Sequence, residues 1–120
     1  MPKTKSKNQI EHDVQSEIRI WCGEHNIVTW RINVGSGYTP DGRFFSTGVP
    51  EGFPDLEICP GNGLLIYCEC KTLTGRQREK QIEFQKQVEA DGYLYLMPRS
   101  LEQFIEKITP YIKEKLGWTI

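Results

Sequence analysis

Two acidic residues and a lysine interrupt the most strand-like part of the sequence, residues 52–71, which read GFPDLEICPGNGLLIYCECK. Two short apolar stretches flank PGNG here, and that combination of residues favours a turn. Because side chains alternate between the two faces of a strand, Glu69 and Lys71 share one face and Cys70 lies on the other. If the apolar faces of the two stretches lie together, Asp55 converges with Glu69.

A third carboxylate is expected from the helix that precedes this segment. Apolar residues recur at helical spacing over residues 9–24, and the line from Ile10 through Val14 to Trp21 includes Glu17. A carboxylate on an apolar helix face is unfavourable unless a partner binds it. Glu17 is therefore predicted to face inward and to approach the other two acids.

A divalent cation would relieve the repulsion between carboxylates that share so small a volume. Mg²⁺ and Mn²⁺ prefer oxygen ligands, and the backbone carbonyl of Cys70 offers one more. Lys71 is then placed to orient or deprotonate a water molecule beside the ion. The alternative is structural: Glu69 and Lys71 form an exposed pair on a solvated strand face, and Asp55 is a turn residue after Pro54.

The cysteines fall mainly within apolar helix or strand patterns, at Cys22, Cys59, Cys68 and Cys70. This placement favours reduced, buried thiols over a disulfide framework. A structural zinc site that uses Cys68 and Cys70 is a further alternative, but no second pair stands at the spacing of a zinc site.

The rest of the sequence supplies the elements that must position these side chains. In chain order we predict a helix over 9–24, a half-buried strand over 28–34, and a long glycine- and proline-rich loop over 35–54 in which only RFFS suggests a short strand. Strands over 55–58 and 64–71, a helix over 74–91, a strand over 93–97, and a last helix from Ser100 that Pro110 breaks or kinks complete the order. The second helix joins two strands as a βαβ unit. The predicted fold class is therefore α/β, with a mixed β-sheet flanked by helices.

Length and composition indicate one globular domain. The chain has 120 residues, of which 38% are hydrophobic and 11% aromatic, and this is enough for a single packed core. We expect a flexible basic arm over residues 1–8, with Lys3, Lys5 and Lys7, and a single domain over 9–120.

The net charge of −1 gives no overall attraction to a polyanion, so nucleic-acid binding would depend on local basic patches. Nothing approaches the run of about 18 apolar residues that a membrane span needs, and the basic N-terminus lacks the apolar segment of a signal peptide. The protein is expected to be intracellular and cytoplasmic, with no membrane association and no secretion.

Pro54-Asp55 followed by Glu69-Cys70-Lys71 resembles the PD-(D/E)XK nuclease motif. The flanking segments RINVGSG, GFPDLEI, LIYCECK and DGYLYLM, and Gln81 ten residues after the lysine, are similar to the virus-type replication-repair nuclease branch, VRR-NUC. The resemblance covers nearly the whole chain. It implies a restriction-endonuclease-like fold with an αβββαβ core, and hydrolysis of phosphodiester bonds in DNA that depends on Mg²⁺ or Mn²⁺.

The resemblance also implies roles for individual residues. Asp55 and Glu69 would bind metal together with the Cys70 carbonyl, and Glu17 would bind or orient its water. Lys71 would act on the nucleophile, and Gln81 would contact that water or the lysine. Relatives commonly have Ser or Thr three residues before this glutamine, where this chain has Arg78.

The expected substrate is DNA, branched in the manner of a four-way junction, cut by a homodimer because paired symmetric incisions require two sites related by a two-fold axis. The side chains expected to contact DNA are Arg31, Tyr38, Arg43, Arg76 and Arg78. The apolar residues Ile112, Leu116, Trp118 and Ile120 are suggested for the dimer surface, and burial in the core of one chain explains them equally well. Flap or nonspecific nicking, exonuclease activity, and an inactive DNA-binding module are the alternatives. If the protein is viral, it would act in the host cytoplasm.

Overall fold

The computed structural model describes residues 4–118, so Lys3 and Ile120 lie outside the described residues. Its elements are α1 (Lys7–Glu24), β1 (Val28–Arg31), β2 (Ser36–Tyr38), β3 (Phe44–Ser46), β4 (Leu56–Gly61), β5 (Leu64–Cys68), α2 (Glu79–Ala90), β6 (Leu94–Leu96) and α3 (Leu101–Leu116). No helix among them combines the length and the apolar composition needed to cross a membrane.

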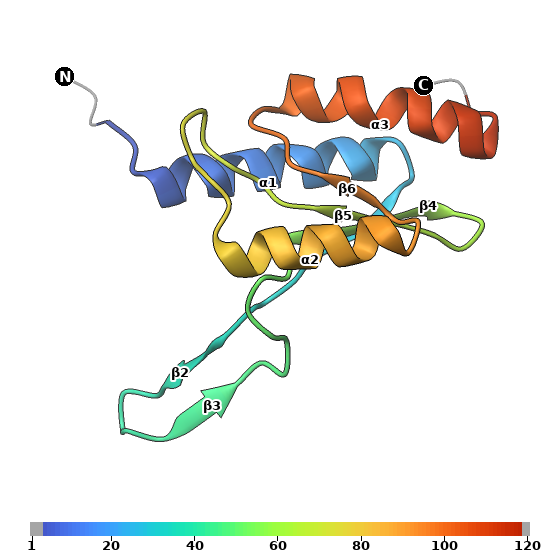
Figure 1. The fold of residues 1–120 in the computed structure, drawn as a ribbon. Helices are drawn as coiled ribbons and strands as arrows, with labels where there is room; N and C mark the ends of the chain where they lie inside the picture. The colour runs from blue at the N-terminus through green and yellow to red at the C-terminus, as the bar shows by residue number, and fades with distance from the viewer. Residues whose placement is uncertain (1–3, 119–120) are drawn as a thin grey trace.

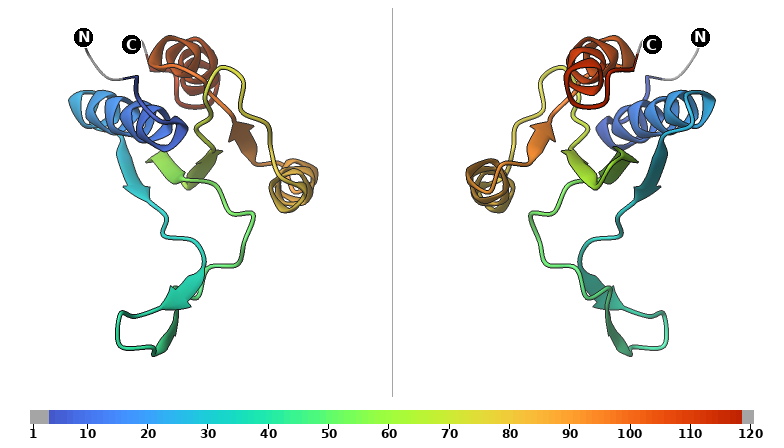
Figure 2. Two further views of the ribbon diagram at one scale, coloured as in Figure 1. Left: turned by 90° about the vertical axis from the view of Figure 1, so that its left-hand side faces the viewer. Right: turned by 90° about the vertical axis from the view of Figure 1, so that its right-hand side faces the viewer.

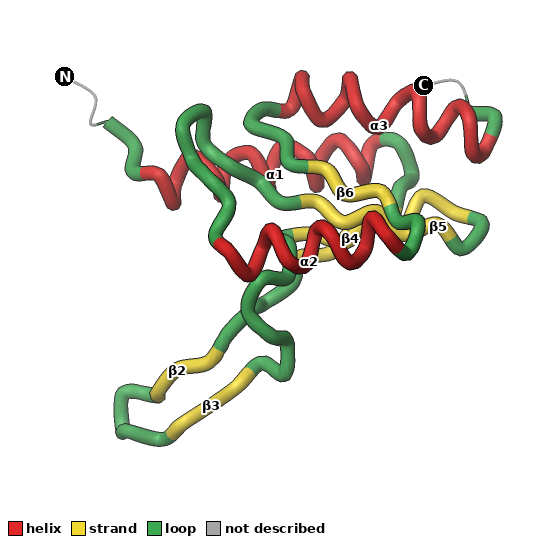
Figure 3. Tube along the Cα trace, viewed as in Figure 1, coloured by secondary structure: helices red, strands yellow, loops and turns green. Residues whose placement is uncertain are grey.

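A four-stranded mixed sheet forms the centre of the molecule, in the order β1-β4-β5-β6. Figure 3 shows its strands β4, β5 and β6 in yellow. β4 is antiparallel to both β1 and β5, whereas β5 and β6 are parallel and are joined through α2. The predicted α/β class, the mixed sheet, the βαβ unit and the αβββαβ core are confirmed.

The turn between β4 and β5 follows from its sequence. Asn62 and Gly63 both have positive φ, at 53° and 76°, and connect the paired residues Gly61 and Leu64. Positive φ at both central positions defines the turn type whose twist matches an antiparallel hairpin, and Asn-Gly is its preferred sequence. The turn starts the pairing at Gly61 and Leu64, and a register shift between Ile58 and Gly61 then brings Leu56 opposite Cys68.

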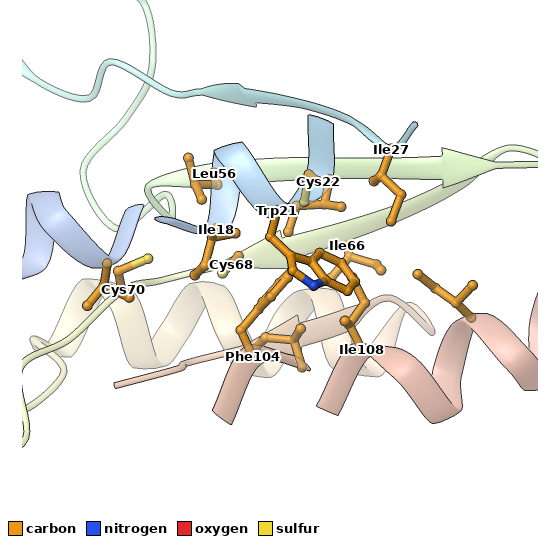
Figure 4. Close-up of a cluster of buried hydrophobic side chains, with 14 residues drawn as sticks. Ile18, Trp21, Cys22, Ile27, Leu56, Ile66, Cys68, Cys70, Phe104 and Ile108 are labelled. Carbon is orange, nitrogen blue, oxygen red and sulfur yellow. The ribbon is translucent and has the colours of Figure 1, made fainter. Parts of the chain in front are cut away.

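The sheet lies between two helical layers (Figure 1). α1 and α3 cover one face, where Ile18 and Phe104 pack with Leu56 and Ile66 in the main core (Figure 4). α2 covers part of the other face, with the Phe84 ring 5.0 Å from that of Tyr67.

Several details differ from the sequence-based expectations. β1 is an edge strand, and Val28 and Trp30 are 59% and 44% exposed, so the strand does not bury its apolar side. α1 begins at Lys7, inside the expected arm, and Lys5 is ion-paired with Asp13.

The C-terminal helix also differs from expectation. α3 continues through Pro110 to Leu116, so the proline does not end it. Ile112 is fully buried in the core and is therefore unavailable as part of a dimer surface. Leu116 packs against the same core, whereas Trp118 is exposed.

The long loop contains a small hairpin of its own. β2 and β3 form a separate two-stranded sheet that projects from the body (Figures 1 and 2). β3 includes most of the segment RFFS for which a short strand was predicted.

Candidate active site

Asp55 stands immediately before β4, after the fully buried Pro54. Its Oδ2 accepts a hydrogen bond of 2.8 Å from the backbone amide of Cys70, just beyond β5. Because β4 and β5 pair with their apolar faces together, this contact lies at the common end of the two strands. The predicted convergence of Asp55 with the Glu69–Lys71 segment is confirmed.

Glu69, Lys71 and Gln81 form a buried hydrogen-bonded group. Gln81 donates from Nε2 to Glu69 Oε1 at 2.9 Å and accepts from Lys71 Nζ at 3.0 Å. Lys71 Nζ also lies 3.6 Å from Glu69 Oε1. Each of these residues is less than a tenth exposed. The reading of Glu69 and Lys71 as an exposed pair on a solvated face is therefore wrong.

Gln81 also connects this group to the start of α2. Its Oε1 accepts a second bond, 2.9 Å long, from the backbone amide of Arg78, the residue that caps the helix. Ser or Thr at the cap would return a hydrogen bond to Gln81, but a guanidinium has no acceptor atom. The Arg78 side chain therefore makes no capping hydrogen bond, and only the bond from the Arg78 amide to the Gln81 side chain caps the start of α2.

A cavity of about 490 Å³ opens over these residues. The acidic side chains on its wall are Glu11, Asp55 and Glu69, and the basic ones are Arg31, Lys71, Arg76 and Arg78. Opposite charges therefore meet in one cavity, where Glu69 is buried, Asp55 and Glu11 are half-buried, and Arg31, Arg76 and Arg78 are exposed. Such a cavity can hold an anion through the arginines and a cation through the acids.

The carboxylates are poorly solvated. Burial, together with the neighbouring Asp55, raises the pKa of Glu69 to about 8, and the ammonium of Lys71 lowers it without offsetting the burial. Burial likewise raises the pKa of Asp55, although its bond from the Cys70 amide acts in the opposite direction. Both acids would gain from a positive charge placed between them.

One oxygen of this site has no partner. Glu69 Oε2 is buried and accepts no hydrogen bond, whereas Oε1 is bound by Gln81. A buried carboxylate oxygen left unpaired is unfavourable, and a cation ligated there would satisfy it. Between residues 4 and 118 no three His, Cys, Asp or Glu side chains lie close enough to share an ion, so the structure does not show the predicted group of three carboxylates around one ion. Asp55 and Glu69 both line the cavity.

The prediction that Glu17 faces inward is wrong, because its side chain is exposed and does not line the cavity. The buried stripe of α1 runs through Gln15, Ile18 and Cys22, and one turn before Gln15 it reaches Glu11. Glu11 lines the cavity and raises the pKa of both buried acids. The carboxylate from α1 at this site is therefore Glu11.

The segment after Lys71 is held by Arg99, a residue that the sequence analysis did not select. Its Nη1 donates to the carbonyls of Thr72 and Gly75, the latter at 2.8 Å. These bonds fix the loop that carries Arg76 and Arg78 toward the cavity. No sequence motif marks Arg99, since a guanidinium that binds backbone carbonyls leaves no spacing signature.

The residues expected to contact DNA separate into two groups. Arg31, Arg76 and Arg78 line the cavity. Tyr38 and Arg43 belong to the projecting hairpin instead, and Arg43 Nε lies 3.1 Å from Asp41 Oδ2. The structure therefore does not bring these two residues to the buried acids.

Comparison with known proteins supports the fold. A solved structure described as "VRR_NUC domain" superposes with a TM-score of 0.64 at 17% sequence identity, over 85% of this chain and 97% of that chain. No protein-family model matches the sequence, and no curated protein matches it significantly. The chain therefore has the fold of a VRR_NUC domain.

Proposed function

We propose that this chain, which has the fold of a VRR_NUC domain, is a divalent-metal-dependent nuclease that hydrolyses phosphodiester bonds in DNA. The observation that carries the proposal is the buried, unpartnered Oε2 of Glu69 beside Asp55, with Lys71 fixed next to it by Gln81. A domain with a purely structural role has no need of a desolvated carboxylate pair.

The donor set fits Mg²⁺ or Mn²⁺. Asp55 and Glu69 offer carboxylate oxygens, which these hard cations prefer, and the backbone carbonyl of Cys70 lies between Glu69 and Lys71 in the chain. We propose these groups as the metal ligands, with Glu11 in the supporting role first assigned to Glu17. A bound divalent ion would supply charge neutralisation and polarisation of a phosphate.

The side chains themselves supply the remaining steps. Lys71 is held through Nζ by Gln81, so its amino group is fixed beside the carboxylates; as the ammonium it can orient a water molecule, and as the neutral amine it could accept a proton from one. Gln81 sets that position and also holds Glu69 Oε1. The exposed guanidinium groups of Arg76 and Arg78 on the cavity wall can bind flanking phosphates.

We further propose that two copies of this chain form a homodimer that cuts branched DNA such as a four-way junction. The acids of the cavity described above can serve one cut, and two symmetric cuts need two such sites. Flap cleavage, nonspecific nicking and exonuclease action are the alternatives within the same chemistry. We expect the protein to act in the cytoplasm.

The test is incubation with linear, nicked, flap and four-way DNA in Mg²⁺, Mn²⁺ or EDTA. Cleavage should require the metal and should fall by about 10²–10⁴-fold in Asp55→Asn, Glu69→Gln and Lys71→Met. Glu11→Gln should impair cleavage, whereas the matched change Glu17→Gln, on the exposed side of α1, should not. Product lengths identify the preferred DNA shape. Cleavage that survives the loss of Asp55 or Lys71 would refute the proposal.

Calorimetric titration with Mg²⁺ alone gives a readout that does not depend on DNA. Wild-type protein should bind the ion, and Asp55→Asn and Glu69→Gln should bind it at least about tenfold more weakly. Equal binding by wild type and both variants would remove these residues from the metal site.

A further inference from the structure

The hairpin of β2 and β3 stands outside the packed body of the domain (Figure 2). Its strands pair only with each other, and its tip is closed by short-range bonds, such as Thr39 N to Arg43 O at 2.7 Å and Arg43 N to Thr39 Oγ1 at 3.0 Å. A lone two-stranded hairpin is marginally stable in water. The free energy of folding of such a hairpin becomes more favourable when a ligand covers its surface.

The two faces of the hairpin differ. On one face Phe45 is paired with Gly37, and its ring lies so close that a Cβ at Gly37 would be 3.1 Å from it. Phe45 thus covers the hairpin backbone. On the other face Tyr38 is paired with Phe44, and their rings meet edge to face at 5.7 Å while remaining 73% and 64% exposed. We call Tyr38 and Phe44 the ring pair.

The ring pair lies close to the candidate active site along the chain. Ile32, Asn33 and Val34 line the cavity, and β2 begins shortly after them. Four residues of extended chain place Tyr38 within about 14 Å of Val34. The base of the hairpin is tied by Gly35, whose carbonyl accepts from Thr47 N at 3.0 Å. A DNA strand with a phosphate in the cavity would pass the ring pair within a few nucleotides.

We propose that the ring pair stacks on unpaired bases of the DNA substrate and so directs the enzyme to DNA that is locally single-stranded; this inference rests on the proposed function. Every base offers an aromatic face, so stacking on an aromatic side chain does not depend on the base sequence. Arg43 is ion-paired with Asp41, so the hairpin carries aromatic surface rather than net charge at its tip. That composition suits bases rather than phosphates.

The size of the ring pair argues against a second copy of the chain as its partner. Two aromatic side chains bury about 150–250 Å² each, whereas a stable contact between proteins buries about 800 Å² on each side. The ring pair is therefore too small to hold a dimer by itself, but it matches the area of one or two bases.

The test compares binding of a blunt duplex with that of the same duplex carrying splayed, unpaired arms, in EDTA so that no cleavage occurs. Tyr38→Leu and Phe44→Leu, singly and together, keep an apolar side chain and remove the ring. Tyr38→Phe and Phe44→Tyr keep a ring. Ile20→Ala, an exposed apolar site on α1, is the matched control. A 2-aminopurine in the splayed arm reports stacking through its fluorescence.

The double Leu variant should bind splayed DNA about tenfold more weakly, as the loss of one stacked base predicts, and should bind the duplex as wild type does. It should also lose the quenching of 2-aminopurine, while the ring-keeping variants and Ile20→Ala retain both properties. An equal loss on both DNAs, or no loss on either, would overturn the inference. A change in the sedimentation of the DNA-free protein would overturn it too, because the rings would then join two copies.

Cleavage in Mg²⁺ is measured separately on the same variants. If no DNA is cleaved by wild type but the ring effect on binding persists, the proposed nuclease function fails and the stacking surface stands. If wild type cleaves and the ring-removing variants keep its substrate preference, the nuclease function stands and the stacking surface fails.

Discussion

Glu69 is the acid of the site whose pKa is raised to about 8. Its carboxylate is 4% exposed and lies beside Asp55, so ionising it in the folded, metal-free protein is unfavourable. In the unfolded chain the same group ionises near its usual pKa of 4.5. The difference between these two states links the stability of the fold to pH and to metal.

The metal-free protein is expected to lose stability as pH rises. Since the pKa of Glu69 is raised to about 8 in the fold, its contribution is fully favourable below pH 4.5 and is lost as pH rises to about 8. Glu69→Gln should therefore raise the melting temperature of the metal-free protein at pH 8 by several degrees, because about 1 kcal/mol shifts a domain near this size by about 4–8 °C. Thermal melts from pH 5 to 9, with and without Mg²⁺, measure the effect.

Mg²⁺ should stabilise the wild type at pH 8 and should have little effect on Glu69→Gln. Glu17→Gln, at an exposed position on the same helix as Glu11, is the control and should melt like the wild type in both conditions. A metal-free Glu69→Gln protein that is less stable than the wild type at pH 8 would contradict the inference that the ionised Glu69 carboxylate destabilises the fold.

Gln81 is expected to act on the rate rather than on DNA binding. Its amide holds both Lys71 and Glu69, so Gln81→Ala frees the lysine, and kcat should fall about 10–100-fold, as for other residues that orient catalytic groups. KM should change little because the arginines of the cavity remain. Gln81→Glu keeps an acceptor for Lys71 but loses the donor to Glu69, so it should not restore the rate. Steady-state kinetics on one cleavable DNA separate the two parameters.

At the scale of elements, the strands were more predictable than the helix faces. A strand has a period of two, so the co-facial arrangement of Asp55 and Glu69 followed from placing the apolar faces of β4 and β5 together, and the register shift between Ile58 and Gly61 was not foreseen. A helix has 3.6 residues per turn, and its stripe can advance by either three or four residues at each step. The step from Val14 to Glu17 rather than to Ile18 rotated the inferred face, and so Glu17 was selected in place of Glu11.

The position of Asp55 depends on the close approach of Gly52 to α2. Gly52 has φ of +96°, and a Cβ there would lie 2.5 Å from the carbonyl oxygen of Lys80. Gly52→Ala should destabilise the fold by roughly 1–3 kcal/mol, since it adds both backbone strain and a clash. It should also reduce cleavage, because the same loop leads through Pro54 to Asp55. Chemical denaturation and the cleavage assay measure the two effects.

Gly48→Ala is the matched control for that change. Gly48 also has a positive φ, of +81°, but no atom lies within 4 Å of the Cβ that would be added. It should therefore cost only the backbone strain, about 1–2 kcal/mol, and leave cleavage unchanged. Equal losses in the two variants would show that the contact with α2 does not matter.

At the scale of the whole molecule, the layered body could be predicted and the projecting hairpin could not. Apolar periodicity indicates which residues are buried in the packed core, and it predicted the order of the helices and strands. The hairpin buries little of its own surface, so its aromatic residues look the same in the sequence as those of a loop. Its only local signals were the turn residues around Pro40 and the segment RFFS.

The body should fold without the hairpin. Gly35 and Thr47 are hydrogen-bonded at its base, so residues 36–46 can be replaced by Asn-Gly without separating the ends. The melting temperature should change by no more than a few degrees, because the main core lies between the sheet and the helices α1 and α3. Circular dichroism melts measure this. A shortened protein that does not fold would show that the hairpin contributes to the core.

The short turn between β4 and β5 also has a consequence for how the chain reaches its folded state. The Asn62-Gly63 turn makes this pairing the most local one in the sheet, so it is expected to form early, and its closure brings Asp55 and Glu69 together. The two carboxylates would then already repel each other in the transition state for folding. Glu69→Gln should accordingly speed refolding of the metal-free protein at pH 8 and leave its unfolding rate nearly unchanged, which stopped-flow chevron plots would reveal.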